Sequence, residues 1–444
     1  MISKTLLLFL AAPVFAQDAL SLRDAVRLAL RENKAVAASN AAMSASESRI
    51  QEARSGRLPK VNYSESFVRS DNPVFVFSSL LTEHQFGPDN FNIGPLNRPG
   101  SVNNFQSVLS VDQPIYDAGQ TRHAVKSADL SRNVSAEEQR RTQMQVISGV
   151  VRAYYGAVLA AERLKTTEQA LRSAKADLQR AESVRAAGMS TDVDVLSIRV
   201  HLAAVTEQRI QSAADLDFAK SGLNDALGLP LDGLHTLTSS LNPLDLPELG
   251  LASYEKDASA TRPEARASHL AADLARSQSE SARSALLPEV GFHAAFEADR
   301  QQFINKGGAN WLASIGLKWN LFNGNGDKAR IEESSHWLER AHADEQRVDS
   351  AVRLEVRRAW ADLRAAAQRI EVAKAAVAEA DESLRITQNR YEAGMSNVTD
   401  LLRNETAVLE SRTRLLAAVH DQRLAAANLE LAAGRLSPDS EVLN

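Results

Sequence analysis

The residues that could perform chemistry in this sequence are nine histidines, many carboxylates and one glycine-rich turn. The histidines are scattered, and none forms the H-E-x-x-H spacing that places two imidazoles on one helix face for zinc. Gly324-Asn325-Gly326 lacks the Gly-Lys-Ser/Thr that completes a phosphate-binding loop, so we interpret it as a turn between a strand and a helix. A G-x-S-x-G nucleophile elbow is also missing from the sequence. The sequence therefore predicts a protein that is not an enzyme and that has no metal or cofactor site. The histidines are His84, His123, His201, His235, His269, His293, His336, His342 and His420.

The composition excludes further classes of protein and favours long helices. The 444 residues include 51 Lys+Arg and 56 Asp+Glu, which gives a net charge of −5 and no basic excess for nucleic acid. The absence of cysteine excludes disulfides, zinc ribbons, thiol catalysis and a lipid-modified cysteine. Glycine (20) and proline (13) are few for this length, which is typical of a mainly helical protein.

The first residues have the pattern of an export signal. Lys4 precedes the apolar run 5–12, and small residues lead up to Ala16. A basic residue, a short apolar core and a small-residue cleavage site predict a signal peptide over residues 1–16. The run is too short to span a membrane, and we find no other segment that approaches 18 uncharged apolar residues. We expect an exported protein without a transmembrane helix.

The chain is an internal duplication. With an offset of 206 residues, Ala187-Gly188-Met189-Ser190 aligns with Ala393-Gly394-Met395-Ser396, and Asp194 aligns with Asp400. Nearer the start of each half the offset is 229, so the first half carries 229 − 206 = 23 extra residues between Pro59 and Tyr116. Matching positions in the same order at a constant offset indicate two copies of one structural unit.

Each half contains a long helical segment with a heptad seam. In the second half, the steps between seam residues alternate between 4 and 3, which is the 3.5-residue period of a coiled coil. Proline is absent between Pro114 and Pro230 and between Pro288 and Pro438, so each half has room for a helix of about 65 residues, or about 100 Å. The seam consists of Val352, Val356, Ala359, Leu363, Ala366, Ile370, Ala373, Val377, Ala380 and Leu384.

Each half also contains two segments that alternate between apolar and polar residues. The clearest run from Trp311 to Trp319 and from Val290 to Phe296. Alternating segments of about ten residues with tryptophan at their ends are typical of transmembrane barrel strands, although a soluble sheet with one buried face has the same pattern. Four strands are too few for a membrane barrel, which needs about eight, so membrane strands would require several copies; three copies give 12 strands. The residues between Asp71 and Gly100 are expected to form a long outer loop.

These features divide the chain into two repeats. The predicted parts are the signal peptide 1–16, a first repeat 17–228, a linker 229–261, a second repeat 262–434 and a tail 435–444. Within the repeats we expect strands at about 59–70, 102–113, 288–299 and 310–320, long helices at 117–186 and 325–392, and shorter helices at 191–228 and 396–434.

The duplicated strands and helices and the paired Ala-Gly-Met-Ser turns resemble the TolC family of outer-membrane efflux proteins. The resemblance covers essentially the whole mature chain and rests on Tyr116-Asp117-Ala118-Gly119, Phe322-Asn323-Gly324, 187–196 and 391–402. It implies a fold that is mainly α with a small β part, in which a homotrimer shares one 12-stranded β-barrel in outer-membrane lipid and a coiled-coil α-helical barrel in the periplasm. The family implies a passive duct for small molecules, which an inner-membrane transporter expels through a periplasmic adaptor protein.

The resemblance also assigns the two Ala-Gly turns to the periplasmic mouth of the channel. The candidates for the pore constriction are Asp192, Asp194, Asp400, Arg403 and Tyr391, because like charges that converge on a threefold axis attract cations and repel anions. The alternative is that each aspartate caps the helix that follows the turn, which we favour for Asp192 and leave open for Asp400. Tyr391 matches the family, but Arg403 and Ser396 differ from it, so Arg403 is a possible partner of Asp400 within or across protomers. The residues of the turns, which could contact the adaptor, are Gly188, Met189, Ser190, Gly394, Met395 and Ser396.

Two other functions are compatible with parts of the sequence. The first is a duct for type I protein secretion, which the sequence does not separate from drug or metal efflux. The second is a soluble periplasmic adaptor or scaffold, which predicts one helical hairpin and no duplicated strand pair. The duplication argues against the second.

Overall fold

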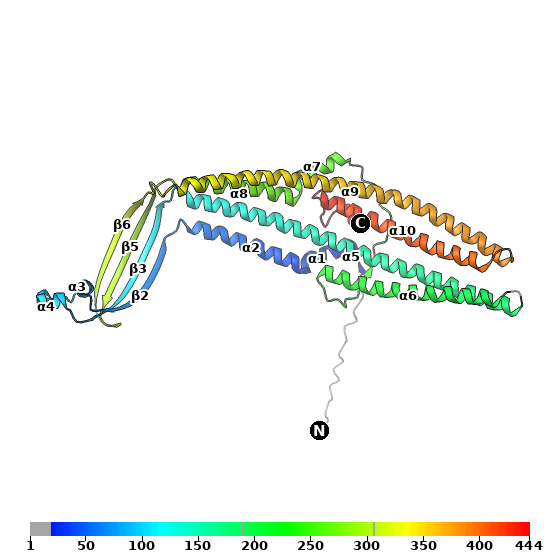
Figure 1. Ribbon diagram of the computed structural model, residues 1–444, viewed down its shortest axis with the longest axis horizontal. Coiled ribbons are helices and arrows are strands. Elements are labelled where there is room, and N and C mark those ends of the chain that lie inside the picture. The colour runs from blue at the N-terminus through cyan, green and yellow to red at the C-terminus, as the bar shows by residue number, and fades with distance from the viewer. Residues whose placement is uncertain (1–18, 189, 305–306) are drawn as a thin grey trace, which may run out of the picture. The chain divides into compact units, whose positions relative to one another are not determined.

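The structure is a computed structural model that describes residues 19–188, 190–304 and 307–444; the predicted signal peptide and Met189 lie outside these ranges. Within them, the chain divides into two compact units. Unit 1 contains residues up to 42, 136–267 and 346–444, and unit 2 contains residues 43–135 and 268–345. The long helices α5 and α9 contribute residues to both units (Figure 1). The larger helices are α1 (Leu22–Glu32), α2 (Lys34–Ser55), α5 (Gln120–Ala186), α6 (Asp192–Leu227), α7 (Leu251–Thr261), α8 (Pro263–Ser284), α9 (Gly326–Glu392) and α10 (Val398–Ala432).

The sheet of unit 2 has four antiparallel strands in the order β2-β3-β5-β6. Its outer strands, β2 and β6, each have one edge without a partner strand in the described chain. The strands are β2 (Lys60–Ser70), β3 (Val102–Tyr116), β5 (Glu289–Arg300) and β6 (Gly308–Lys318), and Figure 1 shows them side by side.

One face of this sheet is apolar and exposed. The register pairs Tyr63 with Leu109 and Phe296 with Trp311, which aligns large apolar side chains across all four strands. Glu65 interrupts this face and is paired with Arg300 at 2.7 Å. Apolar side chains on a free sheet face are stable only where another apolar phase covers them. The largest exposed ones are Val61, Tyr63, Phe67, Leu109, Phe296, Trp311, Ile315 and Leu317.

The opposite face of the sheet is polar. Nδ1 of His293 lies 2.7 Å from Oδ1 of Asp112, and Asn104 donates a hydrogen bond to Asp299 at 2.7 Å. Gln106 and Glu297 also contact each other on this face. An antiparallel sheet with one apolar and one polar face fits a barrel with lipid outside and water inside.

Unit 1 is built from the two predicted helical hairpins. α5 pairs with α6, and α9 pairs with α10 (Figure 1). The buried residues of α9 fall on the predicted heptad seam and include Val352, Val356, Leu363, Ala366 and Ile370. The prediction of a mainly helical protein with coiled-coil packing and a small β part is therefore confirmed.

A second, smaller β element was not visible in the sequence. β1 (Ala19–Leu20) and β4 (Thr236–Leu237) form a two-stranded parallel pair. The buried hydroxyl of Tyr154 donates to the carbonyl of Leu20 at 2.8 Å and accepts hydrogen bonds from the backbone N–H groups of Thr238 (3.2 Å) and Ser239 (3.0 Å). Two-residue strands carry no periodicity, so only the tertiary packing around Tyr154 reveals them.

The extra segment of the first half is more ordered than a plain loop. It contains α3 (Pro73–Thr82), the 3-10 helix η1 (Pro88–Phe91) and α4 (Ile93–Asn97). Asn72 caps α3 because its side chain accepts the N–H groups of Val74 and Phe75. α3 packs against β3, β5 and β6, which places this segment at the ends of the strands.

One helix is long and apolar enough to be considered as a membrane span. α5 contains an 18-residue window of mean hydropathy 1.2. Because 61% of that window is buried inside the fold, its hydropathy reflects the helical core of unit 1.

Candidate functional site: the hairpin turns of unit 1

Both hairpins of unit 1 end in a turn that begins with glycine in the left-handed conformation. Gly188 has φ 78° and Gly394 has φ 70°, which side chains with a Cβ adopt at a cost. The N–H of Gly188 donates to Arg185 at 2.9 Å, and the N–H of Gly394 donates to Tyr391 at 3.0 Å. These bonds satisfy the last carbonyls of α5 and α9, so the Ala-Gly motif is explained by helix termination.

Asp194 belongs to the cap of α6. Thr191 is the N-cap, and its hydroxyl accepts the N–H of Asp194 at 3.3 Å. The Asp194 carboxylate accepts the N–H of Thr191 at 3.2 Å and its hydroxyl at 2.9 Å, and the hydroxyl of Ser190 at 3.1 Å. Partial burial raises the pKa of Asp194, but these hydrogen bonds outweigh it and hold the pKa below the usual range. Asp194 is therefore ionised at neutral pH, with its charge fixed at the turn.

The N-cap positions are not occupied by the aspartates that the sequence suggested. Thr191 is the N-cap of α6 and Asn397 is the N-cap of α10, so the expectation that Asp192 is the cap is wrong. An N-cap residue has an extended backbone, whereas Asp192 is already the first residue of the helix. Its carboxylate forms an ion pair with Arg185 instead. Asp400 donates its N–H to Asn397 at 2.8 Å, and its carboxylate accepts the hydroxyl of Ser396 at 3.4 Å.

Tyr391 and Arg403 have different environments. Tyr391 packs with Leu178 and Leu402 against a small apolar cluster that connects the two hairpins. Burial, followed by the charges of Asp194 and Asp177, raises the pKa of the Tyr391 hydroxyl. Arg403 is exposed, and within the described ranges it forms no ion pair with Asp400 of the same chain. A pair across protomers stays a prediction.

The sequence analysis missed a buried group of ionisable side chains near these turns. Asp177 on α5, His201 on α6 and Glu405 on α10 meet between the hairpins; Nε2 of His201 lies 3.2 Å from Oε2 of Glu405. Arg180 lies 3.2 Å from Asp177 and 3.4 Å from Glu392 on α9. Asp177, His201 and Glu405 lie on three different helices and are far apart in the sequence, so no local motif predicts their contact. The side chain of Thr167 is also buried, so buried polar groups recur on α5.

The two carboxyl groups of this cluster have pKa values that are shifted in opposite directions. Burial, followed by the contact with Glu405, raises the pKa of Asp177 to about 7. Burial also raises the pKa of Glu405, but the hydrogen bonds from His201 and Asp177 outweigh it and lower the net pKa. Near pH 7 Asp177 is therefore partly protonated, and its protonated form can donate to the ionised Glu405 and connect α5 to α10.

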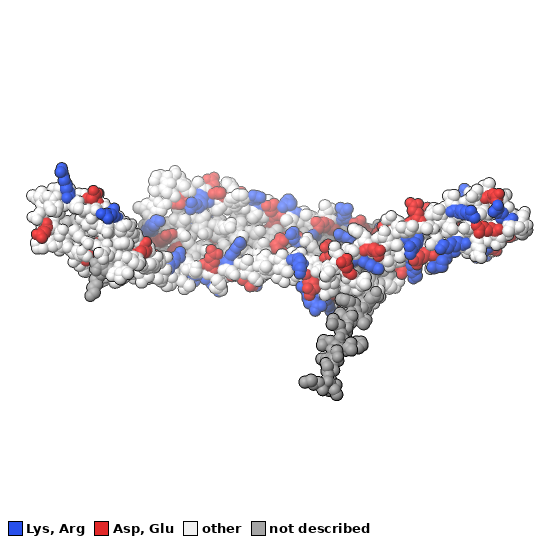
Figure 2. Space-filling view, turned by 90° about the horizontal axis from the view of Figure 1, so that it is seen from below, with Lys and Arg blue, Asp and Glu red and all other residues white. Residues whose placement is uncertain are grey.

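The exposed surface of the hairpins carries both signs of charge. Figure 2 shows basic and acidic side chains intermixed over the hairpins. Arg199 on α6 pairs with Glu182 on α5 at 2.7 Å, and Arg412 on α10 pairs with Asp381 on α9 at 3.0 Å. Exposed pairs of this kind contribute little stability, so the seam residues hold each hairpin together.

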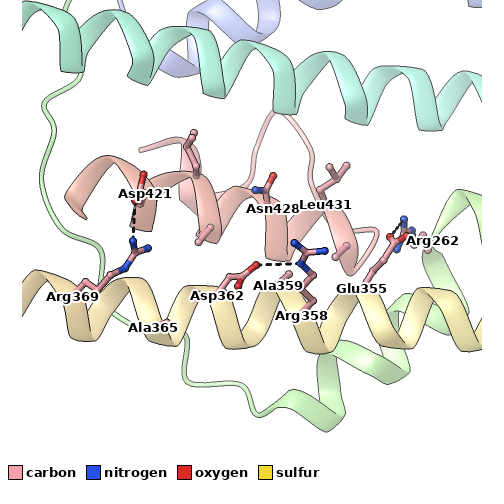
Figure 3. Close-up of a pocket in the computed structure, with 13 residues that line it drawn as sticks. Arg262, Glu355, Arg358, Ala359, Asp362, Ala365, Arg369, Asp421, Asn428 and Leu431 are labelled. Carbon is pink, nitrogen blue, oxygen red and sulfur yellow. Dashed lines mark hydrogen bonds and ion pairs between the residues drawn. The ribbon is translucent and has the colours of Figure 1, made fainter. Parts of the chain in front are cut away.

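A groove of about 510 Å³ lies between α9 and α10 (Figure 3). Its floor contains small apolar residues such as Ala359 and Ala425, and ion pairs such as Arg369–Asp421 (3.2 Å) cross its walls. Arg358 and Asp362 on its rim are largely exposed. Alanines on a helix surface allow another helix to approach closely, so the groove fits the side of a further helix.

The architecture defines the class of this protein. A sheet with one apolar and one polar face, joined to paired helical hairpins, is the subunit of an outer-membrane channel of the TolC type. The chain matches the family described as outer membrane efflux protein over residues 25–229 and 256–435. It belongs to that family, and the resemblance inferred from its motifs is confirmed. The protein is thus an outer-membrane efflux or secretion channel that extends into the periplasm.

Individual relatives agree with this assignment. The chain is 26% identical to alkaline protease secretion protein AprF of Pseudomonas aeruginosa over 430 residues, which cover 94% of this chain and 85% of the relative. It is 25% identical to outer membrane efflux protein BepC of Brucella suis, over 74% and 72% of the two chains. The outer membrane channel CmeC of Campylobacter jejuni has the same fold with a TM-score of 0.79, 16% identity, and coverage of 97% and 92%.

Proposed function

We propose that three copies of this chain assemble into one passive export duct. The observation that carries the proposal is the open sheet of unit 2, whose edge strands β2 and β6 have no partner strand within the described chain. A bilayer does not tolerate unpaired backbone groups on an open sheet edge. Because the four strands alternate in direction, β6 of one copy and β2 of the next meet antiparallel. Three copies then close a barrel of 3 × 4 = 12 strands, within the range of known barrels.

The helical unit supports the same assembly. The groove between α9 and α10 has the small apolar floor that a neighbouring helix requires, and the seam residues of α9 already pack within the hairpin. Helices of three copies that pack side by side enclose a tunnel. The chain supplies no nucleotide-binding or catalytic motif, so transport energy is assigned to an inner-membrane transporter.

The hairpin turns are the proposed contact with a periplasmic adaptor. Met395 is 66% exposed at one turn and Val193 is 69% exposed beside the other. Apolar side chains on exposed turns are common in protein contacts. The turn residues assigned to the adaptor are Gly188, Met189, Ser190, Gly394, Met395 and Ser396.

The proposed constriction of the tunnel also lies at these turns. Asp400 is the strongest candidate, because Ser396 is the only side-chain partner of its carboxylate in the described chain, which leaves the charge available to a pore. Asp194 contributes a fixed charge, and Tyr391 connects the hairpins behind it. Asp192 and Arg403 complete the candidate set.

Membrane fractionation tests the assembly. The full-length protein should sediment with outer membranes and migrate on native gels as a heat-sensitive trimer. Paired cysteines introduced on the edges of β2 and β6 should crosslink between copies, whereas the same cysteines on β3 and β5 should crosslink only within one copy. A soluble periplasmic monomer would overturn the proposal.

A second candidate function is the outer-membrane duct of type I protein secretion. The relative that covers 94% of this chain is named for the secretion of a protease, whereas the efflux relative covers 74%. Deletion of the coding sequence distinguishes the two. Efflux predicts greater sensitivity to toxic small molecules, and secretion predicts the loss of one or more proteins from the medium.

A further inference from the structure

We propose that the outer end of the sheet carries a divalent cation site, suited to Ca²⁺, that pins α3 to the strand ends. The candidate ligands are carboxylate oxygens of Glu83 and Asp299 and the amide oxygen of Asn104. The three come from the end of α3, from β5 and from β3, and all belong to unit 2.

The ligand atoms are buried and lack partners. Glu83 is 2% exposed and Asp299 is 0% exposed, although both carry a carboxylate. Neither oxygen of Glu83 has a partner at good hydrogen-bond geometry in the described chain, although the side chain of Gln301 lies near it. One oxygen of Asp299 and the amide oxygen of Asn104 also lack a hydrogen-bond partner there. A buried carboxylate without a partner costs several kcal/mol, so the two carboxyl groups require neutralisation, and the amide oxygen of Asn104 is a further free acceptor beside them.

Packing brings these three residues close together. Asn104 donates to the other oxygen of Asp299 at 2.7 Å, and Asp299 is paired with Gly308 on β6. A Cβ at Gly308 would collide with the carbonyl oxygen of Thr82 and lie 3.1 Å from the carbonyl carbon of Glu83, so only glycine admits the end of α3 here. Asn310 donates to the same Thr82 carbonyl at 3.4 Å, which fixes the approach.

The chemistry of the ligands selects the class of ion. All the free atoms are oxygens, from two carboxylates and one amide, and calcium prefers six to eight such ligands in flexible geometry. Mg²⁺ demands octahedral geometry and keeps several waters, which suits a buried site poorly.

The consequence would be a calcium-dependent closure at the outer mouth. Asn104 and Asp299 lie on the polar face of the sheet, which faces the water-filled interior of a barrel. Glu83 is the first residue after α3, so an ion shared with Asp299 would hold the segment 71–101 across the strand ends.

Calorimetric titration of CaCl₂ into the detergent-solubilised full-length protein, after dialysis against EGTA, tests the site. The expected result is one saturable site per chain, with MgCl₂ at least ten-fold weaker. Chymotrypsin cleavage within 71–101, at residues such as Phe75 and Phe91, should slow about 100-fold when free Ca²⁺ is 100 times the dissociation constant. The absence of both effects would overturn the proposal.

Matched variants separate the site from a general effect of calcium. Asp299→Asn and Glu83→Gln should each reduce calcium affinity at least ten-fold and abolish the protection. Glu83→Gln lies outside the strands and keeps the test available if Asp299→Asn fails to fold. Asp89→Asn removes an exposed acid of the same segment and should bind like the wild type. Protection that follows pH and not Ca²⁺ would assign the carboxyl groups to a shared proton and refute the metal.

Discussion

His201 on α6 lies 3.2 Å from Glu405 on α10, and this contact joins the two helical hairpins of unit 1. Asp177 on α5 hydrogen-bonds to the same carboxyl group, so side chains from three helices meet in one cluster. Charged and titratable groups surround it on every side: Arg180 on α5, Glu392 and Tyr391 on α9, and the cluster members themselves. The hairpins are thus connected by a contact whose strength depends on protonation.

The first prediction concerns the pH dependence of this contact. The folded-state pKa of Asp177, about 7, lies above its unfolded value, so the contribution of Asp177 to stability is complete below about pH 4 and is lost as the pH rises to 7. The loss is at most about 1.4 kcal/mol per pH unit. Asp177→Asn, whose amide donates without a charge, should flatten this dependence and exceed the wild type in melting temperature at pH 8.

Thermal unfolding between pH 4 and pH 8 measures this effect. Asp217→Asn, which removes an exposed carboxylate of α6, serves as the control and should keep the wild-type slope. Parallel slopes for Asp177→Asn and the wild type would show that Asp177 does not titrate in this range.

The second prediction concerns the pore. Arg403 is exposed and has no ion pair with Asp400 of its own chain among the described residues, so a pair across protomers would be broken by Arg403→Ala. The single-channel conductance in planar bilayers should rise several-fold, because the mouth would lose a charge contact between copies. Arg414→Ala removes an arginine that pairs within α10 at 3.6 Å and should leave the conductance unchanged. Equal conductance of the wild type, Arg403→Ala and Arg414→Ala would contradict an Arg403–Asp400 pair across protomers.

The third prediction concerns the buried hydroxyl of Tyr154. Tyr154→Phe leaves the Leu20 carbonyl and the N–H groups of Thr238 and Ser239 without their partner. The free energy of unfolding should fall by about 1–3 kcal/mol, the cost of unsatisfied buried polar groups. Chemical denaturation provides the measurement, and Tyr116→Phe, at a tyrosine that is 49% exposed, should change it little.

The fourth prediction concerns the end of α6. Gly228 has φ 79°, and a Cβ there would lie 2.8 Å from the carbonyl oxygen of Glu32. Gly228→Ala should therefore destabilise the fold by at least about 1–2 kcal/mol. Gly222→Ala lies inside the same helix with free space around it and should be neutral or slightly stabilising. A melting-temperature comparison of the two variants tests the difference.

The features of the fold that repeat along the chain could be predicted from the sequence. The seam of α9 has a period of 3.5 and the strands a period of 2, and both patterns persist long enough to be recognised. α3 and the β1–β4 pair were not predicted, because they are short and depend on packing. The same reason explains why Asp177, His201 and Glu405 were overlooked: each is an isolated polar residue on a helix, and only the assembled hairpins bring them together.

The capping of the turns shows a different limit. Thr191 and Asp194 form a reciprocal cap three residues apart, a spacing that the sequence already contained. Asp192 was the predicted cap, but the N-cap position belongs to Thr191, one residue earlier. The register of a cap depends on which residue has extended backbone, and this is decided by where the Gly188 turn ends.

The pairing of β3 with β5 has a consequence for the kinetics of folding. Asn104 and Asp299, which bond across this pair, are 195 residues apart in the sequence. The chain therefore has to be exported as far as Arg300, the end of β5, before the central strands can meet, and contacts of such long range form slowly. Until then the β2–β3 hairpin presents an apolar face and an unpaired edge to the periplasm, which invites aggregation. The cell has to shield this hairpin during the interval, so newly exported subunits should accumulate as aggregates when periplasmic holding chaperones are depleted.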